Sequence, residues 1–471
     1  DKNVAIGHQA LLGGDLGTSD KDFVGNIAIG AYALDATGTN DSVGVVAIGD
    51  RALTAFTGSL GKNVCIGYES GLANETGSRN VMVGYDTGIT ATDMDNAVFI
   101  GYEAGKLTTA DNTTAIGSQA LAALTSGAGN TAIGFQSGTA ITDAFSNTAV
   151  GYNALITNTQ GDKIVAIGYE AGKVYNPTAD YGNSVFIGHQ AGLATTTARK
   201  ATVVGDLAVS VGVMTGHENI VVGHYAGADL TSATGSTLLG TEAGANVTQG
   251  NYNTFVGAQS GDALTIGVRN TAVGRHSLSE TVDVDHVVAI GYNALGGAAL
   301  TVGASNADGT VGVGYNVMEA LTSGHGNIAI GFEALKEHST GSRNIVIGYQ
   351  AMHDTIFMGY QSGGGQWTTD DSNFNIGIGN YTLDAILNGA LHNLTIGYTS
   401  MSELTTGKAN IGLGSYAAAN MTTGVNNIAI GAHDGSINAA LVTNTVGSYN
   451  VAIGTGALST ANENDNDGSI A

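Results

Sequence analysis

The sequence is poor in proline, cysteine and charge. Among 471 residues, Pro177 is the only proline, Cys65 is the only cysteine, and 11% of the residues are charged. A single cysteine excludes an intrachain disulfide, so burial and hydrogen bonding must hold the fold together. No run of 18 or more apolar residues occurs, so the sequence offers no membrane-spanning helix. We expect no insertion into a membrane.

Positive charge is also scarce, because 15 Lys and Arg face 39 Asp and Glu, for a formal net charge of −24. Such a surface repels phosphate backbones and anionic lipids, so nucleic acid is not expected as a partner. The acidity favours an extracellular setting. The chain starts at Asp1 without Met or a signal peptide, and we expect a processed or partial chain.

Glycine is abundant, with 73 residues, but it does not recur at every third position as in collagen. It instead marks a repeat of the type Asn-x-Ala-Ile/Val-Gly, whose glycine we call the anchor. Of the 25 gaps between 26 anchors, 14 are 17 residues long. Such regular spacing is typical of a solenoid, in which each coil stacks on the last. The clearest anchors are Gly7, Gly30, Gly134, Gly151, Gly274, Gly331, Gly431 and Gly454.

Each position of the repeat predicts a local structure. The residue before the anchor is Ile or Val in 23 of 26 copies, which indicates a β-strand. The residue two before the anchor is small in most copies, so we expect the large side chains to fill the coil and the small ones to face another backbone. Asn, four before the anchor in 16 copies, favours a left-handed corner and a stacked ladder. The segment Gly-x-x-Ala/Ser-Leu/Gly after the anchor predicts a second short strand.

The predicted fold is therefore all-β: a parallel β-solenoid of about 26 coils over residues 1–460. Irregular loops are expected near 8–25, 172–183, 296–310, 352–375 and 434–449, and an acidic tail over 461–471. One thin coil buries little core, and apolar residues on both strand faces leave a stripe that favours association. A threefold bundle of parallel chains would cover the stripe. The alternative is a monomer whose flat face binds another ligand.

The repeat Asn-Thr-Ala-Ile-Gly-x-x-Ala-Leu resembles the head repeats of trimeric autotransporter adhesins and the similar arrays of phage tail fibres. The likeness runs from Asn3 to about Leu458. It implies a left-handed β-roll, a homotrimer, and attachment to a host cell-surface glycan or protein from an extracellular or virion appendage. The repeats of the adhesins are shorter, and the 471 residues show no heptads of a coiled-coil stalk and no membrane anchor, so we expect a fibre rather than an adhesin. The self-cleaving chaperone domain of many phage fibres is not among these residues either, so we expect that it was removed or that the chain is a fragment.

Aromatic residues in the irregular loops are the candidate ligand-binding residues. Trp367, Tyr175 and Tyr181 lie where the spacing of the anchors is disturbed. Long loops on a rigid scaffold often carry recognition, and an exposed ring could stack on a sugar. The alternative is that Trp367 fills a defect in the stack of coils.

Acidic residues provide the candidate metal ligands. Glu69, Asp86 and Glu103 follow consecutive anchors by two residues, so stacking would place them about 5 Å apart, where they could bind Ca²⁺. A solvated polar edge is the alternative, because Gln119, Gln136 and Asn153 hold the same position next. The loop pairs Asp283/Asp285 and Asp370/Asp371 and the run at 463–468 are weaker candidates. No cofactor is otherwise expected.

No catalytic residue is predicted, and we expect no enzyme. Cys65 stands at a position usually held by Ala and is expected to be a small buried residue. His8, His189 and His224 replace the usual Tyr after the anchor and are expected to be packing variants. The alternatives to a phage-like fibre are a bacterial adhesin, a structural filament, a polysaccharide-cleaving tailspike and an ice-binding solenoid. The last would need a regular threonine array, whereas threonine looks scattered among loops.

Overall fold

The computed structural model describes residues 2–12, 23–36, 42–58, 61–178, 182–297, 307–336, 342–351, 355–359, 362–363, 374–385, 387–433, 435, 438–460 and 467–471. These residues contain strands and turns but no helix, and hence no helix long and apolar enough to cross a membrane. The chain divides into two compact units, Asp1–Gln249 and Gly250–Ala471. Trp367, Tyr181, Asp370 and Asp371 lie outside the described residues.

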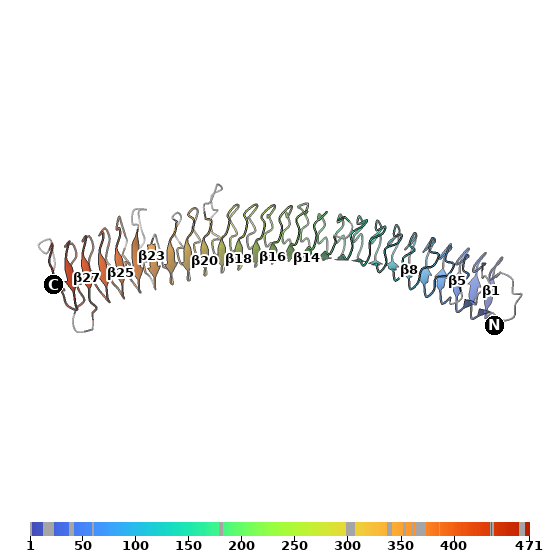
Figure 1. Ribbon diagram of the computed structural model, residues 1–471, viewed down its shortest axis with the longest axis horizontal. Helices are drawn as coiled ribbons and strands as arrows, with labels where there is room; N and C mark the ends of the chain where they lie inside the picture. The colour runs from blue at the N-terminus through green and yellow to red at the C-terminus, as the bar shows by residue number, and fades with distance from the viewer. Residues whose placement is uncertain are drawn as a thin grey trace. The chain divides into compact units, whose positions relative to one another are not determined.

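Each unit is a parallel β-solenoid in which every coil adds one short strand to the main sheet, which confirms the predicted fold class. In Figure 1 the strands follow one another along one edge of the coils and the loops form the opposite edge. The strands of the first unit are β1 (Val4–Ile6), β2 (Phe23–Val24), β3 (Ile27–Ile29), β4 (Ser42–Val43), β5 (Val46–Ile48), β6 (Val64–Ile66), β7 (Val81–Val83), β8 (Val98–Ile100), β9 (Thr114–Ile116), β10 (Thr131–Ile133), β11 (Thr148–Val150), β12 (Val165–Ile167), β13 (Val185–Ile187), β14 (Thr202–Val204), β15 (Ile220–Val222) and β16 (Thr237–Leu239). Those of the second are β17 (Thr254–Val256), β18 (Thr271–Val273), β19 (Val288–Ile290), β20 (Val311–Val313), β21 (Ile328–Ile330), β22 (Ile345–Ile347), β23 (Thr355–Met358), β24 (Asn375–Ile378), β25 (Leu394–Ile396), β26 (Ile411–Leu413), β27 (Ile428–Ile430) and β28 (Val451–Ile453).

The register repeats from coil to coil, because equivalent residues of the repeat pair with one another. Thr131 pairs with Thr148, and Ile133 pairs with Val150. In the second unit Thr271 pairs with Val288 in the same way. Strands β2 and β4 form a separate two-stranded parallel sheet. At the end of the second unit, Ile470 pairs with Val451 as the start of a further coil would, so residues 467–471 lie on the last coil rather than in a separate tail.

The anchor glycines bring consecutive coils into close contact. Gly151 has φ +137°, a conformation that residues other than glycine rarely adopt. A Cβ atom added to Gly151 would overlap the carbonyl oxygen of the next anchor, Gly168. The same contact between neighbouring anchors recurs along both units, so the anchor sets the distance between coils.

The predicted second strand is wrong, because the residues after the anchor form a turn. Glu69 and Gly71 have φ +53° and +64°, which is the left-handed conformation, and Ser70 between them is not left-handed. A strand requires an extended backbone at every residue. The turn still bonds to its neighbours, since the Glu69 N–H donates to the Asp50 carbonyl at 3.0 Å and the Gly71 N–H to the Thr87 carbonyl at 2.8 Å.

The predicted orientation of the strand faces is also reversed. The small residue two before the anchor points into the coil and is buried, whereas its β-branched neighbours point outward and are only half-buried. The inward residue packs against the residue four after an anchor, and in many coils one of these two residues is large and the other small. Phe99 accompanies Gly105, whereas Ala115 accompanies Leu121, and all four are buried. The two positions therefore share one interior volume.

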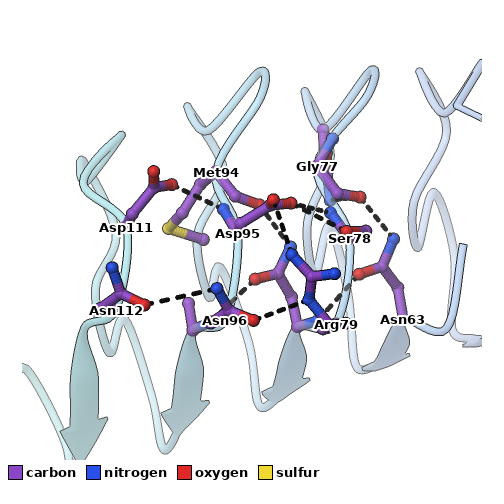
Figure 2. Close-up of polar contacts among 12 residues, drawn as sticks. Asn63, Gly77, Ser78, Arg79, Met94, Asp95, Asn96, Asp111 and Asn112 are labelled. Atoms are coloured by element: carbon purple, nitrogen blue, oxygen red, sulfur yellow. Dashed lines mark hydrogen bonds and ion pairs between the residues drawn. The ribbon is translucent and has the colours of Figure 1, made fainter. Parts of the chain in front are cut away.

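Asparagines four before the anchor form the predicted ladder, which is buried. The Asn80 backbone N–H donates to Asn63 Oδ1 at 2.9 Å, and Asn63 Nδ2 donates to the Gly77 carbonyl at 2.8 Å (Figure 2). Each amide thus satisfies a donor and an acceptor of the next coil, which buried polar groups require. The left-handed residue at this corner is not the asparagine but the residue before it, such as Arg79 with φ +62°.

Candidate interaction face

The outward face of the strands carries exposed apolar side chains on many coils of both units. We call it the outward face and define it by the residues three before, one before and one after each anchor. Strand geometry places the first two positions on one side, because side chains alternate with period two; the third begins the turn after the anchor, and its rings are exposed. Ile133 and Ile167 are each 38% exposed and Tyr152 is 44% exposed. The exposed large members one before the anchor are Ile6, Ile100, Ile133, Ile167, Ile187 and Leu239 in the first unit and Ile290, Ile330, Ile347, Ile396 and Ile453 in the second.

Aromatic rings after the anchors stack along this face. Tyr85 lies between Tyr68 and Tyr102, with ring centroids 5.0 and 5.5 Å apart and nearly parallel planes. In the second unit Tyr315 stacks between Tyr292 and Phe332 at 5.3 and 5.0 Å. A ring inside such a ladder stacks with both faces on neighbouring rings, so its edge is the part that is exposed to solvent. The ladders therefore add flat apolar area and offer few faces for stacking on a sugar.

Histidines take the aromatic position in some coils, where they contact neighbouring rings as expected of packing variants. The His189 ring stacks on Tyr169 at 5.4 Å, and its Nδ1 lies 2.8 Å from Asp206 Oδ1. His8 meets Tyr32 edge to face at 5.3 Å.

Glu69, Asp86 and Glu103 occupy the same position on consecutive coils, as predicted, but basic side chains bind their carboxylates. Arg51 Nη1 lies 3.1 Å from Glu69 Oε1. Lys106 Nζ lies 3.2 Å from Asp86 Oδ2 and 2.7 Å from Glu103 Oε1. The hydrogen bond from Lys106 is the largest cause that lowers the pKa of Glu103.

These ion pairs favour a polar edge over a Ca²⁺ site. The edge continues through amides, since Gln119 Nε2 donates to Glu103 Oε2 at 3.1 Å. Within the described part of the chain, no group of three or more His, Cys, Asp or Glu is arranged to hold a metal ion.

The acidic loop residues Asp285 and Asp308 act as acceptors for backbone groups. Asp285 Oδ1 accepts the Val268 N–H at 2.7 Å, and Asp308 Oδ1 accepts the Asp285 N–H at 2.9 Å. Burial, followed by the charges of Asp285 and Asp308, raises the pKa of Asp283. Figure 2 shows the equivalent corner at Asp95, whose carboxylate bonds to Ser78 and Arg79. These carboxylates stabilise the corner.

Tyr175 is buried, so the prediction that it binds ligand is wrong. Its ring is 0% exposed and meets the Phe186 ring edge to face at 4.8 Å. Its hydroxyl donates to the Ala198 carbonyl at 2.6 Å. The longer coil leaves interior space that the ring fills. Trp367 and Tyr181 remain predictions, because the described residues do not include them.

Burial raises the pKa of Tyr175 to about 12, which predicts a loss of stability at high pH. In the unfolded chain this phenol ionises near pH 10, so the unfolded state loses its proton first as the pH rises. The stabilisation is complete below pH 10 and is lost between about pH 10 and 12, by about 2–3 kcal/mol. Urea unfolding at pH 8 and pH 11.5 measures it. Tyr175→Phe should show a smaller fall, and an equal fall in both proteins would contradict the assignment.

Cys65 is fully buried, as predicted, and burial raises the pKa of its thiol to about 12. A thiol that stays protonated is a poor nucleophile. Its geometry agrees with a packing role.

Sequence reasoning missed a column of threonines eight residues after the anchor. Thr109, Thr125 and Thr142 stand in register on consecutive coils, and the Thr125 hydroxyl donates to the Thr142 carbonyl at 2.8 Å. Threonine is thus ordered in these loops rather than scattered. This column could have been found from the sequence by counting eight residues from each of these anchors.

No protein-family model matches this chain, and no curated protein matches it.

Proposed function

We propose that this protein is a structural attachment module that assembles with copies of itself through the outward face, as a parallel homotrimer in an extracellular or virion fibre. One observation carries the proposal: apolar side chains cover the outward face in coil after coil. Exposed apolar surface of this extent marks an association site. The number of three and the attachment role come from the resemblance of the repeats to those of adhesins and phage fibres.

A second copy of the chain fits this face better than a soluble partner of another shape. The face repeats with the spacing of the coils, about 4.8 Å, and an identical chain repeats with the same spacing. Parallel copies therefore match side chain to side chain along the whole contact. The Ile and Val rows are broken by few charged residues, and interface cores are depleted of charge.

The mass of the native assembly tests the proposal. We expect native mass spectrometry to give three times the chain mass of 47.1 kDa. The double variant Ile133→Glu/Ile167→Glu places two carboxylates on the outward face and should give single chains, because burying unpaired charge is costly. The matched control is Ser126→Glu, which adds charge at an exposed loop position away from this face.

Circular dichroism establishes that each variant is folded. A wild-type mass of one chain would overturn the proposal. So would an Ile133→Glu/Ile167→Glu variant that keeps the wild-type mass.

A further inference from the structure

A hollow of about 170 Å³ opens at one corner of the first unit. Its lining is rich in hydrogen-bond donors, in a chain whose net charge is −24. The residues that line it are Asn183, Arg199, Lys200, His217 and Glu218.

The hollow lies where the repeat changes its charge. Six residues before the anchor, several coils carry an aspartate, such as Asp95, Asp111 and Asp162. These carboxylates accept backbone N–H groups of the preceding coil, as Asp162 Oδ1 does from Phe145 at 2.8 Å. At the hollow, two consecutive coils carry Arg199 and His217 at this position instead. The imidazole of His217 now accepts the backbone N–H, and the guanidinium of Arg199 stands where other coils carry a carboxylate.

The hydrogen bonds at the hollow indicate which of its atoms can still donate. His217 Nδ1 accepts the Arg199 backbone N–H at 3.2 Å, so a neutral ring carries its proton on Nε2 and can donate it. Lys200 Nζ pairs with Glu218 Oε1 at 3.0 Å, and both side chains are well exposed. An exposed pair of this kind is weak and leaves further donor positions on the ammonium. The guanidinium of Arg199 adds the planar donor fork that suits oxyanions.

We propose that this hollow binds a small oxyanion group, a carboxylate or a sulfate, carried by an acidic saccharide. The saccharide as its source rests on the proposed attachment function, whereas the oxyanion chemistry rests on the hollow alone. Its volume suits one charged group, with the rest of the sugar outside. At physiological salt, charges more than about 8 Å away are largely screened, so the acidic remainder of the chain acts only weakly at the hollow, where Glu218 is paired with Lys200.

Isothermal titration calorimetry with sodium glucuronate, glucose 6-sulfate and glucose tests the proposal. We expect an oxyanion sugar to bind, glucose not to bind, and 500 mM NaCl to weaken binding. Arg199→Gln should weaken it at least tenfold, and Lys200→Gln provides a second variant. The matched control is Arg79→Gln. Arg79 stands five residues before its anchor, as Lys200 does, but it does not line the hollow, and its guanidinium pairs with Asp95 at 3.0 Å.

Binding of glucose with equal affinity would overturn the proposal, as would an Arg199→Gln protein that binds like wild type. Binding of only one of the two anionic sugars supports it and identifies the group as carboxylate or sulfate. Native mass spectrometry of the same samples separates the two proposals. Loss of oxyanion binding with the three-chain mass intact sinks this inference alone, and binding by a single chain sinks the proposed assembly alone.

Discussion

Gly151→Ala is expected to cost at least about 3 kcal/mol of unfolding free energy. The methyl group would be placed on a residue with φ +137°, which by itself costs about 1–3 kcal/mol. It would also overlap the carbonyl oxygen of Gly168, and both groups belong to backbone that is bonded to coils on either side. The coils cannot separate locally without losing the hydrogen bonds of the stack. Urea unfolding followed by circular dichroism measures the loss.

Two glycines separate the causes of that loss. Gly129 has φ +73° with only Ser146 Oγ near an added Cβ, at 3.7 Å, and Asn96 and Asn112 hold the same corner position in other coils. Gly129→Asn should therefore change the unfolding free energy by less than about 1 kcal/mol. Gly454 has φ +122° with no atom within 4 Å of an added Cβ, so Gly454→Ala should report the backbone strain alone. Equal losses in all three variants would show that contact between coils is not the cause.

Phe99→Ala is expected to cost about 3–5 kcal/mol, and adding Gly105→Leu should recover most of that loss. Phe99 is 0% exposed and lies 2.8 Å from the position of a Cβ added to Gly105. Ala115 and Leu121 divide the same space the other way in the next coil, and Leu121 adopts φ +49°, close to the +56° of Gly105. The double variant thus copies a combination that the chain already uses.

The measurement is a double-mutant cycle of unfolding free energies. Gly105→Leu alone should destabilise, because Phe99 leaves no room for the new side chain. We expect a coupling of at least about 2 kcal/mol between the two changes. Recovery should be incomplete, because a Cβ on Gly88 would also lie 3.1 Å from the Phe99 ring, so this ring fills space in two coils. Additive effects would contradict the shared interior volume.

The regular spacing of the anchors was enough to predict stacked coils, and the Ile or Val before each anchor was enough to predict the one strand that every coil adds to the main sheet. The direction of the side chains could not be predicted from one strand alone. Alternation with period two says that neighbours point to opposite sides, but not which side is the interior. The size exchange between Phe99 with Gly105 and Ala115 with Leu121 contains that information, because only residues sharing one volume compensate each other in size.

The turn after the anchor was mistaken for a strand because its residues look like strand residues. Glu69 adopts a left-handed conformation, yet neither Tyr68 nor Glu69 is a glycine or asparagine, the residues that usually indicate this conformation in a sequence. The stack imposes this conformation, since both neighbouring coils hold hydrogen bonds to it, and tertiary structure overrides local preference. Among the candidate site residues, the acidic ladder was placed correctly, but the sequence could not show that Arg51 and Lys106 bind it. Tyr175 was misjudged because a longer coil can enclose a ring as easily as expose one.

The exact repetition of the register has a genetic consequence. Removing residues 135–151 would join Gly134 to Tyr152 and present β10 to β12 in the alignment that β10 now has with β11. A recombination between two copies of the repeat in the gene would thus yield a protein with one coil fewer or more. The coils at the junction would pair in the same register as coils elsewhere in the chain. Selection can therefore change the number of coils one at a time, and the length of the solenoid changes with it.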